Sequence, residues 1–288
     1  MIMIAPAMST GKPIPQKSAL LGPDGTPPVL LGAQDAPAFS LHNPAGSAPA
    51  VICCDHAANR VPHALGDLGA VAATMGRHIA YDIGAAGVAR ALSEMLDAQA
   101  VLAGYSRLVI DLNRDPEDFT SIREIYDGTV IVGNRRLTQA ERDQRVDALF
   151  HPYHRALADC MAQRRATVGH PALISVHSCT DYFKGFTRPW HIGVLSNRDR
   201  RMADPVIDYL TAAHPDLTIG DNKPYSGLDA FGYSVETHAM PDGLPNILFE
   251  IRQDIIRSGA GQQRIARMLA DAIGPLLVDP GLFTPFDG

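Results

Sequence analysis

The chain has 288 residues, of which 46% are hydrophobic and 19% are charged, and its formal net charge at pH 7 is -6. This length and apolar content suffice for a packed core in one large or two small domains. The lack of basic runs argues against a nucleic-acid partner, and no segment approaches the roughly 20 apolar residues that span a membrane. We therefore predict a cytoplasmic protein without a membrane partner, and the sequence leaves the oligomeric state open.

The first segment of the chain, residues 1–38, is rich in Pro, Gly, Ser and Ala and shows neither a helical nor a strand period. This composition predicts an arm that lies on the surface or is partly disordered, and we expect no catalytic role for it. The remainder, residues 39–288, contains no internal repeat and no linker that divides it. It is therefore predicted to form a single catalytic domain.

From residue 39 onward, short β-branched runs alternate with longer helical stretches, which predicts an α/β domain with a mostly parallel sheet. Helices are predicted over residues 83–98, 137–166 and 258–277, and Thr138 and Glu141 have the spacing of a capping box. Four apolar runs predict buried strands that lead into polar residues, namely PAVICC, SRLVIDL, PALISV and PNILFEI. Ligands bind where the carboxyl ends of such strands meet, so we expect the functional site there.

The four cysteines lack the CxxC spacing of zinc fingers and redox motifs. In a cytoplasmic protein, thiols stay reduced, and two adjacent cysteines in an apolar run are typical of a core. We therefore predict no disulfide framework among Cys53, Cys54, Cys160 and Cys179.

Two histidines stand at the ends of predicted strands that are far apart in the sequence. His56 follows PAVICC directly after Asp55, and His177 directly follows PALISV. Such a pair is typical of a metal site assembled from distant loops. The alternatives are that His56 is a loop histidine bonded to backbone or to Asp55, and that two histidines stand at strand ends by chance. Asp82 is predicted to cap the next helix, with a place beside the metal as the alternative.

Glu250 lies inside the apolar run ILFEI, where an ionised carboxylate is costly without a partner. It is therefore a candidate general base or metal ligand, and the alternative is a salt bridge to Arg252 or to another buried arginine.

Arg114 follows SRLVIDL, and a guanidinium can bind a substrate carboxylate through two hydrogen bonds. Asn113 is a candidate donor to the same ligand. The alternative is that Arg114 braces its loop by pairing with Asp111 or Asp115.

His238 precedes a Pro-Gly turn and is a further candidate for substrate binding, as a donor to a developing oxyanion, although a surface role is the simpler interpretation. Ser178 follows His177, but no GxSxG elbow exposes a nucleophile, so a serine hydrolase is not expected.

The segments VICCDHAANRVP, YSRLVIDLNRDP, ISVHSCTDY and FEIRQDII resemble, in this order, the N-formylglutamate amidohydrolase family over about residues 48 to 277. The resemblance implies a zinc carboxypeptidase-like fold, a three-layer α/β/α sandwich around a mixed, mostly parallel sheet. It also implies one zinc ion, His56 and His177 as metal ligands, Glu250 as the general base and Arg114 as the carboxylate anchor.

Two positions depart from the pattern of these families. Carboxypeptidase-like zinc sites use His-x-x-Glu, and here the third position after His56 is Asn59, the candidate third ligand. Enzymes that act on formylglutamate itself tend to carry His-Ser-Gly where this chain has His56-Ala57-Ala58. The substrate of this chain is therefore expected to differ.

These features predict a zinc-dependent amidohydrolase that cleaves the amide bond of a small N-acyl acidic amino acid, for example an N-formyl one, with a metal-activated water. Two alternatives remain. One is a zinc peptidase or amidase acting on small peptides or cell-wall amides. The other is a non-catalytic protein of the same fold that binds an acidic ligand.

Overall fold

The structure is a computed structural model that describes residues 29–228, 232–284 and 286. Most of the predicted N-terminal arm lies outside these residues. Within its last part, Leu30 is buried and packs in the same cluster as Val101 and Tyr105. The division into an arm and one catalytic domain stays a prediction.

The centre of the protein is a seven-stranded mixed sheet with the order β1-β3-β2-β6-β11-β9-β10. Neighbours among β3, β2, β6 and β11 are parallel, whereas β1 and β9 run antiparallel to β3 and β11. The strands are β1 (Phe39–His42), β2 (Ala50–Cys54), β3 (Gln99–Ala103), β6 (Ala172–Cys179), β9 (Ile192–Leu195), β10 (Ile219–Asp221) and β11 (Asn246–Arg252).

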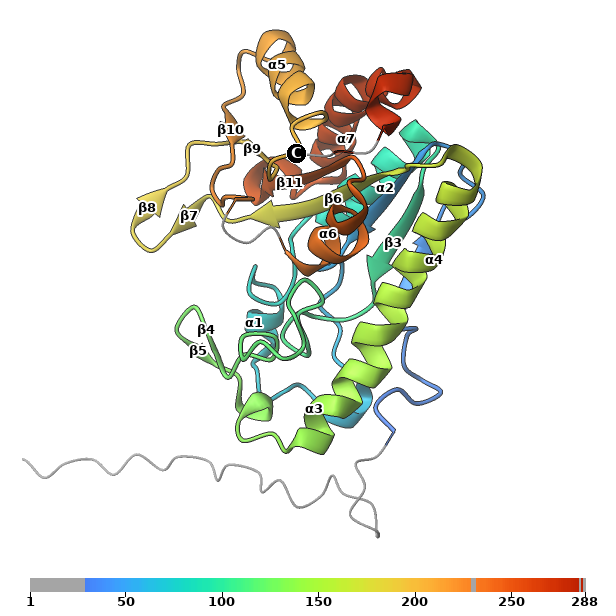
Figure 1. The fold of residues 1–288 in the computed structure, drawn as a ribbon. Helices are drawn as coiled ribbons and strands as arrows, with labels where there is room; N and C mark the ends of the chain where they lie inside the picture. Colours follow the sequence, from blue (N-terminus) through green and yellow to red (C-terminus); the bar gives the residue numbers. More distant parts are fainter. Residues whose placement is uncertain (1–28, 229–231, 285, 287–288) are drawn as a thin grey trace, which may run out of the picture.

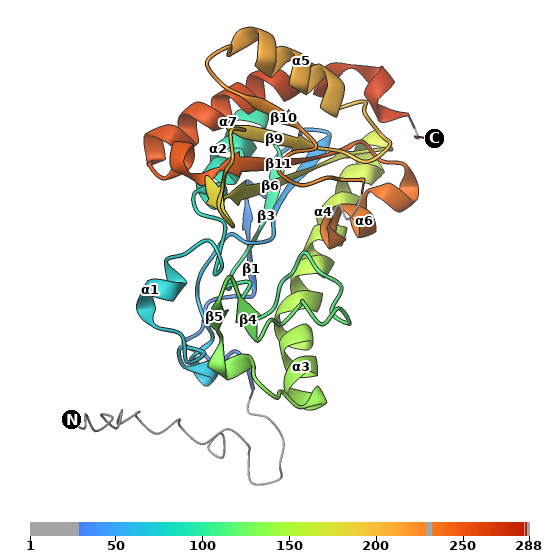
Figure 2. The same ribbon diagram turned by 90° about the vertical axis from the view of Figure 1, so that its left-hand side faces the viewer.

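Two short hairpins extend from the body, β4–β5 (Ile125–Tyr126 and Thr129–Val130) and β7–β8 (Tyr182–Phe183 and Phe186–Thr187). Both project from the same side of the molecule (Figures 1 and 2). They follow β3 and β6 in the chain. Each of them therefore extends from a segment that leaves the carboxyl end of a central strand.

Helices cover both faces of the sheet. They are α1 (Ala72–Met75), α2 (Ala85–Leu96), α3 (Gln139–Arg145), α4 (His151–Val168), α5 (Ala203–Ala213), α6 (Tyr233–His238) and α7 (Gly259–Ile273). Short 3-10 turns occur at His63–Leu65, Val132–Asn134, Met240–Asp242, Gln253–Ile256, Leu276–Val278 and Pro280–Phe283. None of the described helices is long and apolar enough to cross a membrane.

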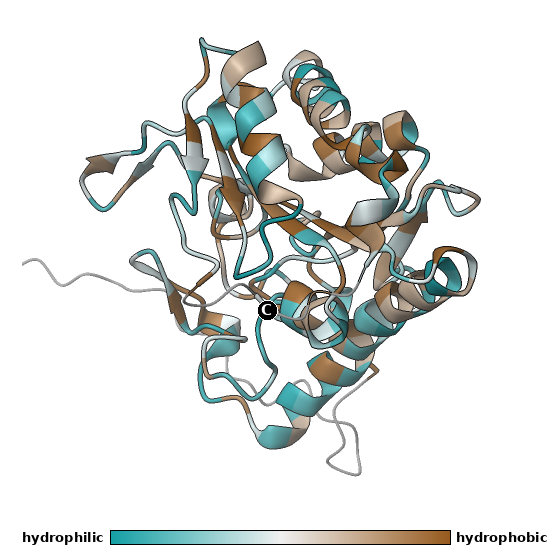
Figure 3. Cartoon of the chain, turned by 45° about the horizontal axis from the view of Figure 1, so that its top comes forward, coloured by the Kyte–Doolittle hydropathy of each residue, from teal (hydrophilic) through white to brown (hydrophobic). Residues whose placement is uncertain are grey.

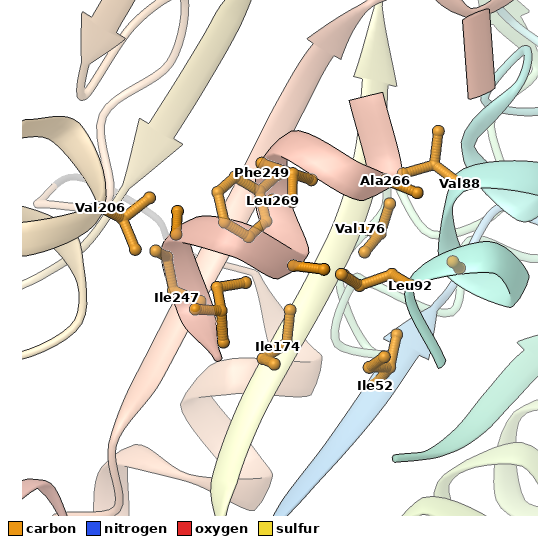
Figure 4. Packing of buried hydrophobic residues seen from close by; sticks show 14 of the residues in the cluster. Ile52, Val88, Leu92, Ile174, Val176, Val206, Ile247, Phe249, Ala266 and Leu269 are labelled. Carbon is orange, nitrogen blue, oxygen red and sulfur yellow. The ribbon is translucent and has the colours of Figure 1, made fainter. Parts of the chain in front are cut away.

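Alternating strand residues divide the core into two layers, because successive side chains point to opposite faces of a sheet. Ile52 and Phe249 belong to the cluster formed with α2, α5 and α7, and Figure 4 shows them facing Leu92 and Leu269. Leu173 lies in the cluster on the other face, with α4. Figure 3 shows the apolar strands enclosed by helices with polar outer surfaces. The predicted three-layer α/β/α architecture is confirmed.

Three of the four predicted strands are present, but SRLVIDL is not a strand. Residues 104–114 form a series of turns, in which the Ser106 hydroxyl donates to the carbonyl of Ala80 and accepts from the amide of Leu108. Asp111 accepts from the amide of Asn113 in the same way. Hydrogen bonds to side-chain oxygens thus take the place of hydrogen bonds to a neighbouring strand. The segment is apolar because it packs against one face of the sheet rather than within it.

Helices are present where the sequence predicts them, and one of them contains an irregular turn. The capping box of Thr138 and Glu141 is present at the start of α3. The helix predicted over 137–166 is present, and residues 146–150 form a π-helical turn within it, between α3 and α4. Pro152 supplies a reason for the change, since proline lacks the amide hydrogen that continues a regular helix.

Candidate active site

Three buried ligand atoms converge at the carboxyl ends of β2 and β6. Nδ1 of His177 lies 2.9 Å from Oδ2 of Asp82, Nδ1 of His56 lies 3.3 Å from the same oxygen, and the two Nδ1 atoms are 3.2 Å apart. The three residues are 2–3% exposed. The sequence places them apart, and the sheet brings them together because β2 and β6 are parallel neighbours.

The outer nitrogen of each imidazole meets a second carboxylate. Nε2 of His56 lies 2.7 Å from Oδ1 of Asp111, and Nε2 of His177 lies 3.1 Å from Oδ2 of Asp55. An imidazole that donates through Nε2 keeps the lone pair on Nδ1, so both histidines present an electron pair to the same point. Carboxylates beyond metal-bound histidines commonly set the tautomer in this way.

The outer carboxylates are themselves held in place. Tyr153 and Ser234 donate their hydroxyls to Oδ1 of Asp55 at 2.6 and 2.7 Å. Arg107 donates to Oδ2 of Asp111 at 2.7 Å and approaches Oδ1 of Asp82 at 3.4 Å. With neutral imidazoles, the three aspartates outnumber the single arginine by two negative charges.

This group fits a divalent metal ion in both charge and spacing. Two negative charges are what a divalent cation balances, and catalytic zinc sites commonly use two histidines and one carboxylate. Tetrahedral zinc with ligands at about 2.0–2.1 Å separates the ligand atoms by about 3.3 Å, close to the spacing of these three atoms. Burial favours neutral His177, but the hydrogen bonds to Asp55 and Asp82 raise its pKa well above the usual value, so the group attracts positive charge.

Asp82, and not Asn59, completes this triad. The prediction that Asp82 caps the helix is wrong, because the N-cap of α2 is Gly84 and the Asp82 carboxylate turns to the two histidines. Asn59 is exposed, and its amide donates to the carbonyl of Met75 at 2.8 Å, outside the lining of the site. The structure therefore does not bring Asn59 to His56.

Glu250 lies beside His177 on the neighbouring strand, since the two residues are register partners between β11 and β6. Its Oε2 is buried and has no hydrogen-bond partner. Burial raises the pKa of Glu250 to about 7. The alternative salt bridge to Arg252 is not formed, because Arg252 pairs with Asp254. Glu250 thus faces the site as a carboxyl group without a structural ion-pair partner among the described residues.

A cavity of about 680 Å³ opens over these groups. It is lined by His56, His78, Asp82, Arg107, Asn113, Arg114, Arg123, Tyr126, His177, Ser178, Cys179, Thr180, Phe183, Leu195, Asn222, Lys223, Pro224, Tyr225, Ser226, Gly232, Leu248 and Glu250. Arginines gather on the side that follows β3, and their charge favours an anionic ligand there.

Arg114 lines this cavity and is only weakly paired. Its nearest ion-pair contact is Asp118 at 4.0 Å, with 40% of the side chain exposed. The alternative brace with Asp111 or Asp115 is not formed among the described residues, since Asp111 is bonded to Arg107 and His56 and the ion-pair contact of Arg114 is Asp118. Asn113 also lines the cavity, and its Oδ1 accepts from the amide of Ser234.

His238 lies outside the lining of the cavity. Its Nε2 is 3.0 Å from Nδ1 of His154, and the two rings stack. Burial and the charge of His154 lower the pKa of His238 to about 4. His238 therefore lies in a packing contact between α6 and α4, and the structure does not bring it to the substrate side.

The loop that carries Asp111 and Arg114 is held from below by a buried guanidinium. Arg145 is 1% exposed and donates to the carbonyl of Val109 at 2.8 Å and to Oδ1 of Asn134 at 2.7 Å. Asn134 in turn donates to the carbonyls of Leu108 and Arg123 at 2.8 Å each. The turns from residue 108 to 134 are thereby fixed relative to α3.

Several residues of the site were not assigned from the sequence. Asp111 and Asp55 offered the same signal as Glu250, a carboxylate within or beside an apolar run. Arg107 and Tyr153 offered none, because their roles depend on which carboxylates the fold places beside them.

Comparisons with known proteins agree with this fold. A solved structure of a gene product from Agrobacterium tumefaciens has a TM-score of 0.82 and 34% identity, and the match covers 86% of this chain and 98% of that one. The N-formylglutamate amidohydrolase structure from Ralstonia eutropha JMP134 has a TM-score of 0.62 at 20% identity, covering 84% and 97% of the two chains, and shows the same fold.

Two sequence matches concern the same family. N-formylglutamate deformylase from Pseudomonas aeruginosa is 31% identical over 96 residues, which are 30% of this chain and 36% of that relative, so the match spans about a third of the relative's length. The family model described as N-formylglutamate amidohydrolase matches residues 48–257, most of the chain. The chain therefore belongs to the N-formylglutamate amidohydrolase family.

Proposed function

We propose that this protein is a zinc-dependent amidohydrolase that cleaves the amide bond of a small N-acyl acidic amino acid. The observation that carries the proposal is the convergence of Nδ1 of His56, Nδ1 of His177 and Oδ2 of Asp82, which would hold the metal. A zinc ion bound there would lower the pKa of water and polarise the acyl carbonyl. The family and the P. aeruginosa deformylase support the choice of an amide bond.

Glu250 is the proposed general base. It lies on the same face of the sheet as His177, lines the cavity and has a pKa that burial raises to about 7. A base with a pKa near the working pH combines a useful deprotonated fraction with enough basicity to take a proton. Glu250 takes the proton from the attacking water and delivers it to the departing nitrogen.

Arg114 is the proposed anchor for the carboxylate of the substrate, and Asn113 is the neighbouring donor. A planar guanidinium can bind both oxygens of a carboxylate, and its weak contact with Asp118 leaves it free to do so. Holding the substrate at this end fixes the position of the scissile bond over the triad, which lowers the entropic cost of reaction.

The non-catalytic alternative depended on the lack of a third metal ligand at Asn59. Asp82 supplies an acidic oxygen at the required place. The position of the Asp82 carboxylate therefore supports an enzyme rather than a non-catalytic binding protein.

The test replaces Glu250 with Gln and follows hydrolysis of N-formyl-L-glutamate by the zinc-loaded protein. We expect kcat to fall by a factor on the order of 1,000, because the amide cannot take the proton, while zinc content and melting temperature are retained. Arg257→Gln, an exposed position just beyond the same strand, is the control. Retention of activity in the Glu250 variant, or no hydrolysis of any N-acyl amino acid by the native protein, would contradict the proposal.

A further inference from the structure

The two sides of the cavity differ in the kinds of side chain that line them. In the sheet, β3 lies on one side of β2 and β6, whereas β11, β9 and β10 lie on the other. Arg114 and Arg123 come from the segment after β3. The opposite wall contains Leu195 of β9 and Leu248 of β11. After β10 it contains Tyr225 among the polar residues Asn222, Lys223 and Ser226. The triad therefore lies between a side with several arginines and a side that also offers aromatic and aliphatic groups.

A buried arginine fixes the aromatic part of this wall. Arg188 is 5% exposed, and its guanidinium carbon lies 5.1 Å from the ring centre of Phe183 and 5.0 Å from that of Tyr225. It donates to the carbonyl of Thr180 at 3.2 Å and to the hydroxyl of Tyr225 at 3.0 Å. No carboxylate lies within ion-pair distance of Arg188 among the described residues. Its contacts instead hold two rings from separate segments.

The rings of Phe183 and Tyr225 are fixed by Arg188 but are not buried. Tyr225 is 46% exposed although its hydroxyl is bonded, and Phe183 also lines the cavity. Leu195 and Leu248 are register partners on β9 and β11, and they line the cavity on the same side with 3% of each residue exposed. Preorganised rings that face a cavity supply large contact area at a low cost in conformational entropy.

The segment that carries Tyr225 packs directly against the strand beside Glu250. A Cβ atom on Gly193 would lie 1.9 Å from the carbonyl oxygen of Lys223 and 3.3 Å from Cβ of Glu250. Only glycine therefore permits this close approach, which keeps the aromatic wall next to the proposed base.

The cavity is also larger than a formylated amino acid requires. N-Formylglutamate has about 12 non-hydrogen atoms. If each of them is given about 30 Å³, the volume of one water molecule in the liquid, the molecule needs roughly 360 Å³. The cavity of about 680 Å³ lies within the range of sites for larger ligands. Once the amino-acid half is placed at the arginines, the acyl half extends to the opposite wall.

We propose that Phe183 and Tyr225, with Leu195 and Leu248, form an acyl subsite for an aliphatic or aromatic acyl group larger than formyl. This inference rests on the proposed function, because it takes the substrate to be an N-acyl amino acid. The reaction is the same hydrolysis: the C–N bond breaks, the water oxygen joins the acyl carbon, and a proton joins the nitrogen. The products are a carboxylic acid and a free amino acid.

The test compares N-formyl, N-acetyl, N-butyryl and N-phenylacetyl derivatives of L-glutamate as substrates of the zinc-loaded protein. We expect kcat/KM to rise about tenfold or more from acetyl to butyryl, because two additional methylene groups are buried. Phe183→Ala is expected to lower kcat/KM about tenfold more for the phenylacetyl substrate than for the formyl substrate, and Phe183→Leu to have a smaller effect of the same kind.

Phe186→Ala is the matched control, since Phe186 belongs to the same hairpin, is 55% exposed and contacts Trp190 outside the cavity lining. Equal effects of the Phe183 and Phe186 variants, or a rate that falls from acetyl to butyryl, would overturn the inference. Preference for an N-succinyl substrate over N-butyryl would also overturn it, because Lys223 and not the rings would then select the acyl group.

A binding measurement separates this inference from the proposed function. Phenylacetate, the acid product, is titrated calorimetrically into the native protein and into the Phe183 variants, with acetate as the comparison. Tighter binding of phenylacetate that is lost in Phe183→Ala supports the subsite even if no amide is hydrolysed, whereas equal binding of both acids contradicts it. Failure of hydrolysis alone counts against the proposed function.

Discussion

Replacing Arg145 with Met tests whether a buried guanidinium holds the loop of the site. The substitution keeps most of the apolar stem and removes donors to the carbonyl of Val109 and to Oδ1 of Asn134. Both acceptors lie in a region that water does not reach, so they lose their partner without replacement.

The expected loss follows mainly from these two bonds, since the third, from Arg145 to the carbonyl of Gly133, is longer at 3.3 Å. Hydrogen bonds from a charged donor contribute about 1.5–3 kcal/mol each, or about 3–6 kcal/mol together. Part of this is offset because burial of the guanidinium is itself unfavourable, which lowers the pKa of Arg145 to about 10. A net loss of about 3 kcal/mol lowers the melting temperature of a domain of this size by about 6–12 °C.

The assay is thermal unfolding followed by circular dichroism, with Arg142→Met as the control. Arg142 lies one helical turn earlier in α3 and is partly exposed, so its substitution is expected to shift the melting temperature by about 1 °C. Arg145→Lys should lie between the two, because one ammonium group replaces the planar fork. Equal melting temperatures for the Arg145→Met and Arg142→Met proteins would refute the reasoning.

Two further predictions concern recognition and pH. Arg114→Lys should raise KM for N-formyl-L-glutamate at least tenfold with little change in kcat, and a variant that instead loses stability would show that Arg114 braces its loop. The pKa of His238 is lowered to about 4 in the folded state, whereas the same side chain in the unfolded chain takes up a proton near pH 6.5. Between these two pH values the unfolded chain binds more protons. The free energy of unfolding therefore decreases as the pH is lowered from 6.5 to 4, by at most about 1.4 kcal/mol per pH unit. Urea unfolding of His238→Gln should show a smaller slope over this range, and an unchanged slope would assign it to other groups.

The sequence by itself determined the elements whose signal is local. Periodicity and capping residues predicted α2, α7 and the start of α3, because a helix records its buried face every three or four residues. Uninterrupted apolar runs predicted β2, β6 and β11 in the same way. Such a run fails as evidence where side-chain oxygens form turns, as Ser106 and Asp111 do in SRLVIDL.

The tertiary structure alone decided how the site is assembled. The sequence offered His56, His177 and Glu250 as candidates because each interrupts or ends an apolar strand, and parallel strands bring such residues to one edge. It could not identify Asp82 as the third member, because a carboxylate before a helix looks the same whether it caps the helix or turns inward. Only the position of β6 beside β2 places His177 where Asp82 can reach it, and that pairing depends on contacts between residues 95 positions apart.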